Sequence, residues 1–270
     1  MLLRSGIALA AVLLGLTGTA VADPGDGDVS TQVVGGTRAS TKDNPFAVFM
    51  VFTGKITPIC GGSIVAPNKI LTAAQCVDEG VTGPKPVPPG SRQIVAGRDD
   101  FRSTTGTVAN ITKIVLHEKY DGISFDFAVL TLDRKLTQKP IQLAGALDSG
   151  LYKPGKNATV LGWGDTTEDG ETSQFLLKAS IPILHDADCT KFWGKDDEGV
   201  DIYDKKSMMC AAHKGGKIDA CQGDSGGPFV AGGKLIGTVQ SGIGCARPNS
   251  PAIYGRVSTV NAWVKQQILY

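Results

Sequence analysis

Residues 219–230 read DACQGDSGGPFV, and this stretch decides the fold. Ser225 follows Asp224 and precedes two glycines, in a segment too rich in glycine for the interior of a helix or strand. Unshielded backbone N–H groups of such a turn can point at one spot beside the serine, as in an oxyanion hole next to a nucleophile. A plain glycine-rich turn near a disulfide is the alternative, but the whole hexapeptide GDSGGP with Cys221 just before it favours a catalytic serine.

Short apolar runs recur along the chain, separated by glycine, proline and asparagine. They include FAVFMVF at 46–52, KIVLH at 113–117, FAVLTL at 127–132, NATVLGW at 157–163 and KLIGTVQ at 234–240. Valine, isoleucine and phenylalanine in such runs predict strands. Apolar residues at helical spacing occur only in the last segment, at Val260, Trp263, Val264 and Ile268, which predicts one C-terminal helix. The 238 residues after Gln32 suit an all-β protein of two packed barrels.

The first 22 residues have the pattern of a secretory signal peptide. Arg4 precedes an apolar run from Ile7 to Leu16, and the small residues up to Ala22 form a cleavage site. A membrane anchor needs about 20 apolar residues, and this run is shorter. Residues 23–32 are polar and predict a short leader. We therefore expect a secreted, extracellular protein with one domain at 33–270.

The charge balance is close to neutral. The chain holds 27 basic and 26 acidic residues. Without residues 1–32 the balance is 26 to 23, because that segment contains Arg4, Asp23, Asp26 and Asp28. No run of lysine and arginine suggests a nucleic-acid partner, and no later apolar stretch could span a membrane. We expect a monomer that meets a protein or peptide, as substrate or as binding partner, without a cofactor.

The chain contains an even number of cysteines, which in an exported protein favours disulfides. The six residues are Cys60, Cys76, Cys189, Cys210, Cys221 and Cys245. Three bridges are expected, and six cysteines allow 15 pairings. A zinc site is the alternative, but no CxxC pair occurs and the histidines lie far apart in the sequence, so no metal is expected. Sequons at Asn110 and Asn157 could carry glycans, although such triplets are common by chance.

Further motifs appear in order along the chain. They are VVGG at 33–36, CGGSIVAPNKILTAAQC at 60–76, DFAVLTL at 126–132, LGWG at 161–164 and DACQGDSGGP at 219–228, followed by GCA and IYGRVS. With these motifs the chain from Val33 onward resembles the trypsin-like branch of the chymotrypsin-fold serine proteases, peptidase family S1. The resemblance implies an all-β fold of two packed six-stranded antiparallel β-barrels with a C-terminal α-helix. It also implies the disulfides Cys60–Cys76, Cys189–Cys210 and Cys221–Cys245.

The resemblance assigns roles to individual residues. Ser225 matches the nucleophile, and Asp126 matches the acid that orients the base. The backbone N–H groups of Gly223 and Ser225 match the oxyanion hole. Asp219 matches the floor of the specificity pocket, where a carboxylate would pair with an arginine or lysine side chain of a substrate.

The activation mechanism of the family is also implied. Cleavage before Val33 would free an ammonium group that folds inward, pairs with Asp224 and shapes the oxyanion hole. An unpaired buried Asp224 would be costly. The bond to be cut follows Gln32, which a trypsin-like enzyme would not cleave. We therefore expect another protease to process this zymogen.

One departure concerns the general base. In the family the general-base histidine belongs to the motif TAAHC. Residues 72–76 of this chain read TAAQC, so Gln75 occupies the position of that histidine. A glutamine amide has no useful pKa near neutrality, so it cannot act as general base or general acid. His117 matches a family position away from the site, and His185 and His213 are expected on outer loops. None of them is expected to replace the base.

Three other departures surround the predicted substrate site. Aligned on Gly242, which the resemblance places with Gln240 at the substrate site, Gln240 replaces a serine that supports the catalytic acid. Ser241 replaces a tryptophan of the substrate groove. The strand before Gly242 is aligned to within one residue. Ala252 occupies a place where trypsin-like pockets keep glycine, and its methyl group would narrow the pocket. Neutral drift explains any one of these changes, whereas their grouping with Gln75 indicates relaxed or redirected constraint.

Two functions follow from these observations. One is a secreted pseudoprotease that keeps the fold but acts by binding, as a decoy, an inhibitor partner or a recognition module. The other is a trypsin-like endopeptidase with residual activity after arginine or lysine, because Ser225, Asp126 and Asp219 are all retained. A third possibility is that Gln75 is not the native residue, since histidine and glutamine codons differ at one base.

Overall fold

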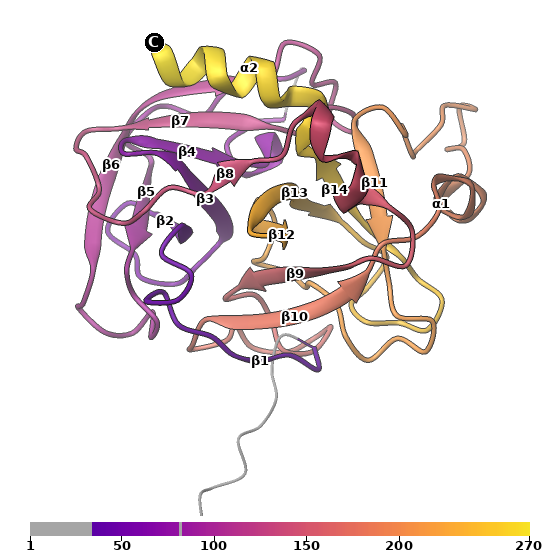
Figure 1. Cartoon of the computed structure of the whole chain (residues 1–270). Helices are drawn as coiled ribbons and strands as arrows, with labels where there is room; N and C mark the ends of the chain where they lie inside the picture. The colour runs from indigo at the N-terminus through magenta and orange to yellow at the C-terminus, as the bar shows by residue number, and fades with distance from the viewer. Residues whose placement is uncertain (1–33, 81–82) are drawn as a thin grey trace, which may run out of the picture. The chain divides into compact units, whose positions relative to one another are not determined.

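A computed structural model describes residues 34–80 and 83–270. The predicted signal peptide at 1–22, the leader at 23–32 and Val33 lie outside the described residues. From Val34 onward the chain folds into two β-sheet bodies, one built from its first half and one from its second half together with the short strand near its beginning, at residues 37–38 (Figure 1). Within the described ranges, no helix is long and apolar enough to cross a membrane.

The first body is a closed barrel, in the strand order β2-β3-β4-β7-β6-β5 among the described residues. The strands are β2 Ala47–Phe52, β3 Cys60–Ala66, β4 Lys69–Thr72, β5 Arg92–Ala96, β6 Thr107–Leu116 and β7 Ala128–Leu132. All their pairings are antiparallel. Its interior is filled by fully buried branched side chains such as Ile64, Ile94 and Leu130. This barrel confirms the first half of the prediction.

The second body differs in detail from the predicted barrel. Within the described ranges its main path runs β1-β10-β9-β12-β13-β14-β11, and β8 pairs with β13 in parallel. Its strands are β1 Thr37–Arg38, β8 Gln142–Leu143, β9 Asn157–Gly162, β10 Leu177–Pro182, β11 Met208–Ala211, β12 Pro228–Ala231, β13 Lys234–Ser241 and β14 Ala252–Arg256. Between β10 and β11, the two ends of the path after β1, the described residues form only an isolated bridge from Ile183 to Ala211. Pro182 ends β10 and has no N–H group with which to extend the ladder.

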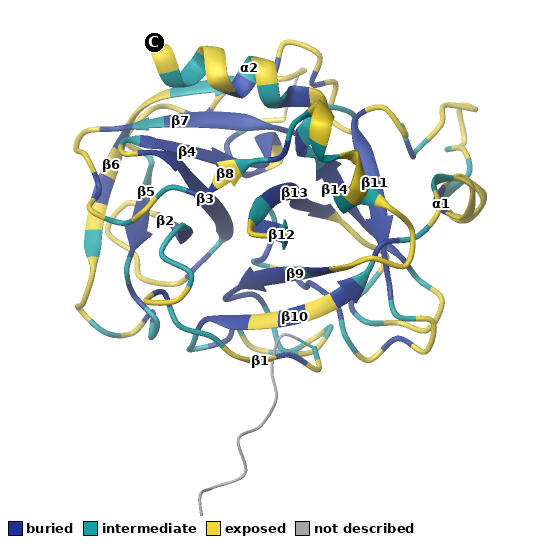
Figure 2. Ribbon diagram, in the orientation of Figure 1, coloured by how far each residue is buried: buried dark blue, intermediate teal, exposed yellow. Residues whose placement is uncertain are grey.

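The strands of both bodies are mostly buried, as the dark blue ribbons of Figure 2 show. Figure 2 also shows the exposed residues concentrated in the loops and on the outer side of the helices. In the second body the rings of Phe229 and Tyr254 stack with centroids 4.0 Å apart, and both side chains are fully buried. Aromatic stacking of this kind adds to the area that the two rings bury.

The C-terminal helix is confirmed as α2, Val257–Leu269. It buries Val257, Val260 and Val264, while Trp263 and Ile268 are only partly covered. The sequence did not predict α1, Asp186–Trp193, or the short 3-10 helices η1, Ala74–Cys76, and η2, Ala146–Tyr152. His185 lies on the exposed loop before α1, as expected, and is the N-cap of this helix.

The two bodies meet at the turn that contains Ser225. The N–H group of Gly61 in β3 donates to the Ser225 carbonyl at 2.8 Å, and Gly226 N–H donates to Val239 of β13 at 2.7 Å. Gly226 has a φ of 79°, and a Cβ there would lie 2.1 Å from Thr72 Oγ1 of β4. Only glycine permits both this backbone conformation and this approach. The close approach of the two sheets thus places Ser225 at their junction.

Candidate active site

Ser225 lies in the turn that leads into β12 and is half-buried. Its hydroxyl donates a long hydrogen bond to the carbonyl of Gln240 at 3.4 Å. Gly223, with a φ of 89°, and Gly226 give the turn its left-handed backbone positions. The turn presents the hydroxyl to a cavity that Ser225 itself helps to line.

Two backbone N–H groups beside this hydroxyl have no protein acceptor. Among the described residues, neither Gly223 N–H nor Ser225 N–H donates a hydrogen bond, whereas Asp224 N–H between them donates to the Cys221 carbonyl at 3.0 Å. Unpaired N–H groups on either side of one residue can bind the oxygen of a carbonyl or an oxyanion. The geometry predicted for an oxyanion hole is therefore available here.

Gln75 and Asp126 are joined by two hydrogen bonds. Gln75 N–H donates to one carboxylate oxygen of Asp126 at 2.8 Å, and Gln75 Nε2 donates to the other at 2.7 Å. Gln75 lies in η1 directly after β4, and Asp126 lies before β7, its neighbour in the first barrel. Gln75 is exposed on the cavity side, whereas Asp126 is only 3% exposed.

Gln75 also reaches the second sheet. Its Nε2 donates to the carbonyl of Gln240 at 2.8 Å, the same oxygen that accepts the Ser225 hydroxyl. An amide group has only two N–H donors, so both are taken by Asp126 and Gln240. No hydrogen bond joins Gln75 to Ser225 within the described part of the chain. With both donors used, the carbonyl oxygen is the polar atom of the Gln75 side chain that is left for other contacts.

Burial dominates the electrostatics of Asp126. Desolvation raises the pKa of this carboxyl to about 6, although the two hydrogen bonds from Gln75 act in the opposite direction. The side chain of Gln240 contacts the main chain of Asp126, because Gln240 Nε2 donates to the Asp126 carbonyl at 3.1 Å. The Oε1 atom of Gln240 is buried and has no partner among the described residues. Gln240 thus bonds the main chain of Asp126 rather than its carboxylate.

The cavity beside Ser225 is a narrow slot of about 210 Å³. Gln75 and Ser225 lie at it together with Gln240, Gly242 and Ala252, so the structure brings these five predicted residues to one place. The β-carbon that a side chain at Gly242 would carry lies 3.7 Å from the Ala252 methyl group. Ala252 is therefore part of the wall of the slot.

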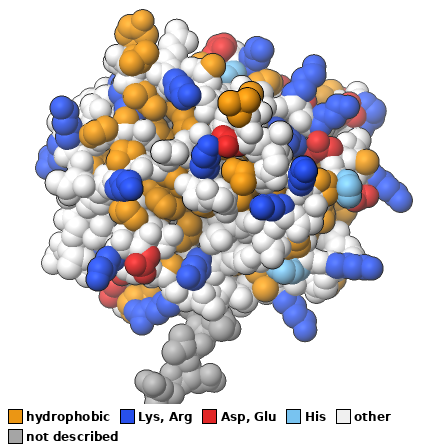
Figure 3. Space-filling view, viewed as in Figure 1, with side chains coloured by type: hydrophobic (Ala, Val, Ile, Leu, Met, Phe, Trp, Pro, Cys, Tyr) orange, Lys and Arg blue, Asp and Glu red, His pale blue; other side chains and the backbone are white. Residues whose placement is uncertain are grey.

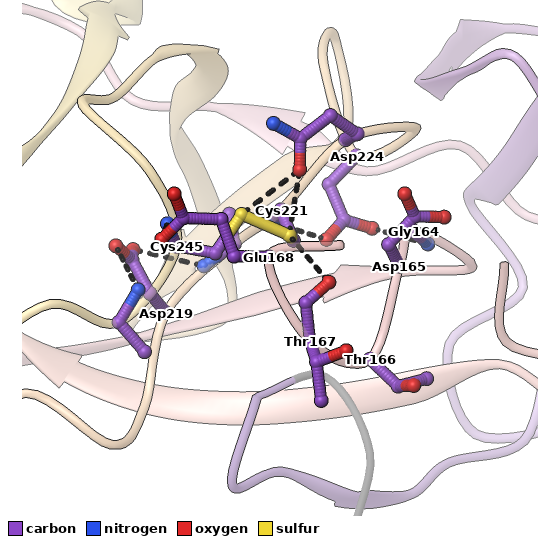
Figure 4. Close-up of a disulfide and its surroundings, with 12 residues drawn as sticks. Gly164, Asp165, Thr166, Thr167, Glu168, Asp219, Cys221, Asp224 and Cys245 are labelled. Carbon is purple, nitrogen blue, oxygen red and sulfur yellow. Dashed lines mark hydrogen bonds between the residues drawn. A yellow bond between two sulfur atoms is a disulfide. The ribbon is translucent and has the colours of Figure 1, made fainter. Parts of the chain in front are cut away.

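Asp219 is close to this slot but is not among the residues that line it. It is 4% exposed, and its carboxylate accepts hydrogen bonds from Ala220 N–H at 2.9 Å and Ala246 N–H at 3.3 Å (Figure 4). Burial raises the pKa of this carboxyl to about 7, and the charge of Asp224 contributes in the same direction. Ala220, which donates to this carboxylate, lines the slot, so Asp219 lies directly behind the lining.

Asp224 is fully buried beside the Ser225 turn. Its carboxylate accepts Gly164 N–H at 2.8 Å and Cys221 N–H at 2.9 Å (Figure 4). Burial raises its pKa to about 6. Gly164 belongs to the LGWG motif, whose part in holding Asp224 the sequence did not reveal. The signal was the pair of glycines around Trp163, because a Cβ at Gly162 would lie 1.9 Å from the carboxylate.

In the described part of the chain, the structure contains the three disulfides implied by the resemblance, Cys60–Cys76, Cys189–Cys210 and Cys221–Cys245. The first holds η1, and with it Gln75, against β3. The third, drawn in Figure 4, ties the segment before Ser225 to the segment after β13. Both of its cysteines line the slot. Each closes a loop whose cross-linking is worth roughly 3 kcal/mol in the chain-entropy account.

None of the three histidines lines the slot. His117 is buried between Phe125 and Trp263, with ring centroids 4.9 and 4.7 Å away, and burial lowers its pKa. His213 contacts the Ser180 carbonyl through Nε2 at 2.8 Å, and His185 precedes α1 as its N-cap. The structure thus brings no imidazole to Ser225.

Two packed β bodies with a serine turn between them, unpaired N–H groups on either side of the serine and a buried aspartate nearby define a trypsin-like serine protease fold and site. The trypsin family model matches residues 33–264, and the chain belongs to this family. It is 40% identical over 238 residues to a trypsin of Saccharopolyspora erythraea, covering 87% of this chain and 98% of that protein.

Animal relatives are similar over almost the same span. Trypsin-1 of Astacus astacus is 38% identical over 244 residues, which cover 86% of this chain and 98% of that protein. Trypsin 5G1 of Aedes aegypti is 33% identical over 247 residues, which cover 88% of this chain and 85% of that protein. Members of this family act on proteins or peptides, so the predicted class of substrate is confirmed at that level.

Proposed function

We propose that the chain is a secreted trypsin-like protease homologue whose peptide-bond hydrolysis is impaired and which acts by binding a protein or peptide. The observation that carries this proposal is the hydrogen bonding of Gln75. Its amide uses both protons on Asp126 and Gln240, and it has no pKa near neutrality at which it could take the proton of Ser225. In the family the histidine at this position does so.

The expected impairment is large. A serine hydroxyl is a weak nucleophile until an adjacent base takes its proton. Losing the base of a serine triad costs on the order of 10⁶ in kcat, which corresponds to about 8 kcal/mol of transition-state stabilisation. The N–H groups of Gly223 and Ser225 remain available to hold a carbonyl oxygen, so binding of a peptide backbone survives the loss of the base.

The same proposal covers the processing of the chain. We infer that a signal peptide at 1–22 directs export, that residues 23–32 form a leader, and that the protease domain spans 33–270 and is made as a zymogen. The fully buried Asp224 supports this inference, because a carboxylate with only two backbone donors gains from a partner cation. The ammonium of a processed Val33 is that cation, and its release after Gln32 requires a protease of different specificity.

The experiment that tests the proposal compares hydrolysis of an arginine-containing chromogenic peptide by chain processed to begin at Val33 and by its Gln75→His variant. We expect the variant to gain several orders of magnitude in kcat/KM. Ser225→Ala in the Gln75→His background is the control and must remove the gain. A native chain as fast as Gln75→His contradicts the proposed impairment. If both are silent, the loss extends beyond the base to the slot.

A second candidate is an endopeptidase with residual activity after arginine or lysine. The unpaired N–H groups beside Ser225 and the retained Asp219 support it, as do the names of the trypsin relatives. An imidazole of the substrate could then take the proton of Ser225 and return it to the leaving amine. Peptides with histidine beside the scissile bond should be cut faster by the native chain than matched peptides with glutamine, and equal rates would exclude this route.

A further inference from the structure

A second cavity, of about 960 Å³, lies on the second sheet and shares no lining residue with the slot. One wall is α1, and another is formed by Ala212, His213 and Lys214 after β11. Pro182 and Leu184 at the end of β10 and the segment before β14 complete it. We call this cavity the α1 groove. Its size is at the upper end of typical ligand sites, about 300–1,000 Å³.

The α1 groove has an apolar lining. Leu184, Phe192 and Pro251 contribute apolar side chains to it. Phe192 is 41% exposed, and its ring meets Trp193 edge-on with centroids 5.5 Å apart. A large aromatic side chain that stays exposed on a packed helix has apolar surface available for a partner, and aromatic residues are enriched among the anchors of binding interfaces.

Its rim is mainly cationic. Lys191 on α1 and Lys214 opposite it are exposed, and neither forms a salt bridge within the described residues. Asp188 is the single acid among the lining residues. Figure 3 shows lysine and arginine side chains spread along the side of the view on which α1 lies. Two free cations that face one apolar groove favour a ligand with carboxylates beside an apolar side chain.

The walls of the α1 groove are held together covalently and by hydrogen bonds. The disulfide Cys189–Cys210 joins α1 to β11. Lys217 N–H donates to the Ala246 carbonyl at 2.9 Å, which ties the turn after His213 to the segment that leads to Pro251. A groove with tethered walls is formed before its ligand arrives, so binding loses little free energy to ordering.

We propose that the α1 groove is an accessory recognition site for an extended acidic peptide segment of a protein partner. Phe192 and Leu184 contact a large apolar side chain of that segment, and Lys191 and Lys214 pair with its carboxylates. The site uses neither Gln75 nor Ser225. It therefore binds its partner whether or not the chain hydrolyses peptide bonds, and its failure is distinguishable from failure of the proposed function.

The test is a fluorescence-anisotropy titration of the purified chain with a dye-labelled decapeptide that carries three glutamates around one phenylalanine and one leucine. We expect saturable binding, at least tenfold weaker for the peptide with glutamine in place of glutamate. The double variant Lys191→Glu, Lys214→Glu should weaken binding at least tenfold, and so should Phe192→Ala. The matched control is Lys55→Glu with Lys135→Glu, two exposed lysines of the first half of the chain, which should bind like the native chain.

Several results would overturn the proposal. Absence of saturable binding at millimolar peptide excludes the site. Equal weakening by the groove variant and the Lys55, Lys135 control would mean that only net charge matters. Unchanged affinity in Phe192→Ala would remove the apolar contact on which the proposal depends. Circular dichroism and thermal unfolding of each variant show whether it is folded, and the remaining folded variants decide the outcome.

Discussion

The carboxylate of Asp126 is held on both oxygens by one residue, Gln75, whose main-chain and side-chain N–H groups donate at 2.8 and 2.7 Å. The neutral amide thus satisfies a buried acid without supplying a base. A histidine at this position would use one ring nitrogen for Asp126 and keep the other for a neighbour. Glutamine instead gives its second proton to the Gln240 carbonyl. Both amide protons of Gln75 are therefore used in bonds that do not involve Ser225.

A carboxylate at position 75 tests this bonding. In Gln75→Glu two acids face each other at Asp126, so we expect the free energy of unfolding at pH 8 to fall by roughly 2 kcal/mol. At pH 5 much of the loss should be regained, because one of the two carboxyls then holds a proton and can donate. Gln75→Ala is the control, since it removes the amide bond without adding charge. Urea unfolding at both pH values measures the effect, and a loss in Gln75→Glu that does not depend on pH would contradict the arrangement.

The reactivity of Ser225 gives a direct chemical readout. A fluorophosphonate reacts with an activated serine by forming an oxygen–phosphorus bond and losing fluoride. Since no base accepts the Ser225 proton, we expect the native chain to be labelled at least about 10³-fold more slowly than Gln75→His, a difference of about 4 kcal/mol. Ser225→Ala must abolish labelling in both backgrounds. Rapid labelling of the native chain would show that another group activates the serine.

The slot wall can be tested without hydrolysis. Ala252→Gly removes the methyl group from the wall, so we expect benzamidine, a flat cation, to bind at least tenfold more tightly, a gain of about 1.4 kcal/mol. The matched control is Ala211→Gly on the paired strand β11, which removes a buried methyl group that does not line the slot. Calorimetric titration measures both. Equal affinity in Ala252→Gly and the native chain would mean that this methyl group does not limit access to Asp219.

The burial of Asp219 sets a pH dependence of stability. Its pKa is raised to about 7 in the folded chain, above about 3.9 in the unfolded chain. Between these values the folded chain holds a proton that the unfolded chain releases, so stability falls as pH rises, by about 1.4 kcal/mol per pH unit for one group. Asp219→Asn cannot titrate and should lose stability less steeply between pH 5 and pH 7. Urea unfolding of the native chain, Asp219→Asn and the exposed control Asp197→Asn checks this, and equal slopes in all three would contradict it.

The barrels and the proximity of Gln75, Asp126 and Ser225 could be predicted from the sequence. Each of the motifs involved has a constant position in a known fold, although the motifs lie far apart in the chain. The role of Asp219 as the floor of the specificity pocket stays a prediction, because Asp219 is not among the residues that line the slot. Whether a carboxylate lines a cavity depends on how neighbours such as Ala252 pack, and no pattern of residue types contains that information. Helix α1 was not predicted from the sequence because, of its eight residues, only Cys189 is buried. The segment therefore has no series of buried apolar residues at helical spacing.

The junction of the two sheets yields the most local prediction. Gly226 and Gly155 have the same φ of 79°, but a Cβ at Gly226 would lie 2.1 Å from Thr72 Oγ1, whereas nothing lies within 4 Å at Gly155. Gly155→Ala should therefore lose only the cost of a left-handed backbone, about 1 kcal/mol. Gly226→Ala adds a clash between β4 and the Ser225 turn, and we expect a loss of at least about 3 kcal/mol or failure to fold. Thermal unfolding of the two variants decides the point. Similar losses in both would mean that the turn can move away from β4, and that the position of Ser225 does not depend on this contact.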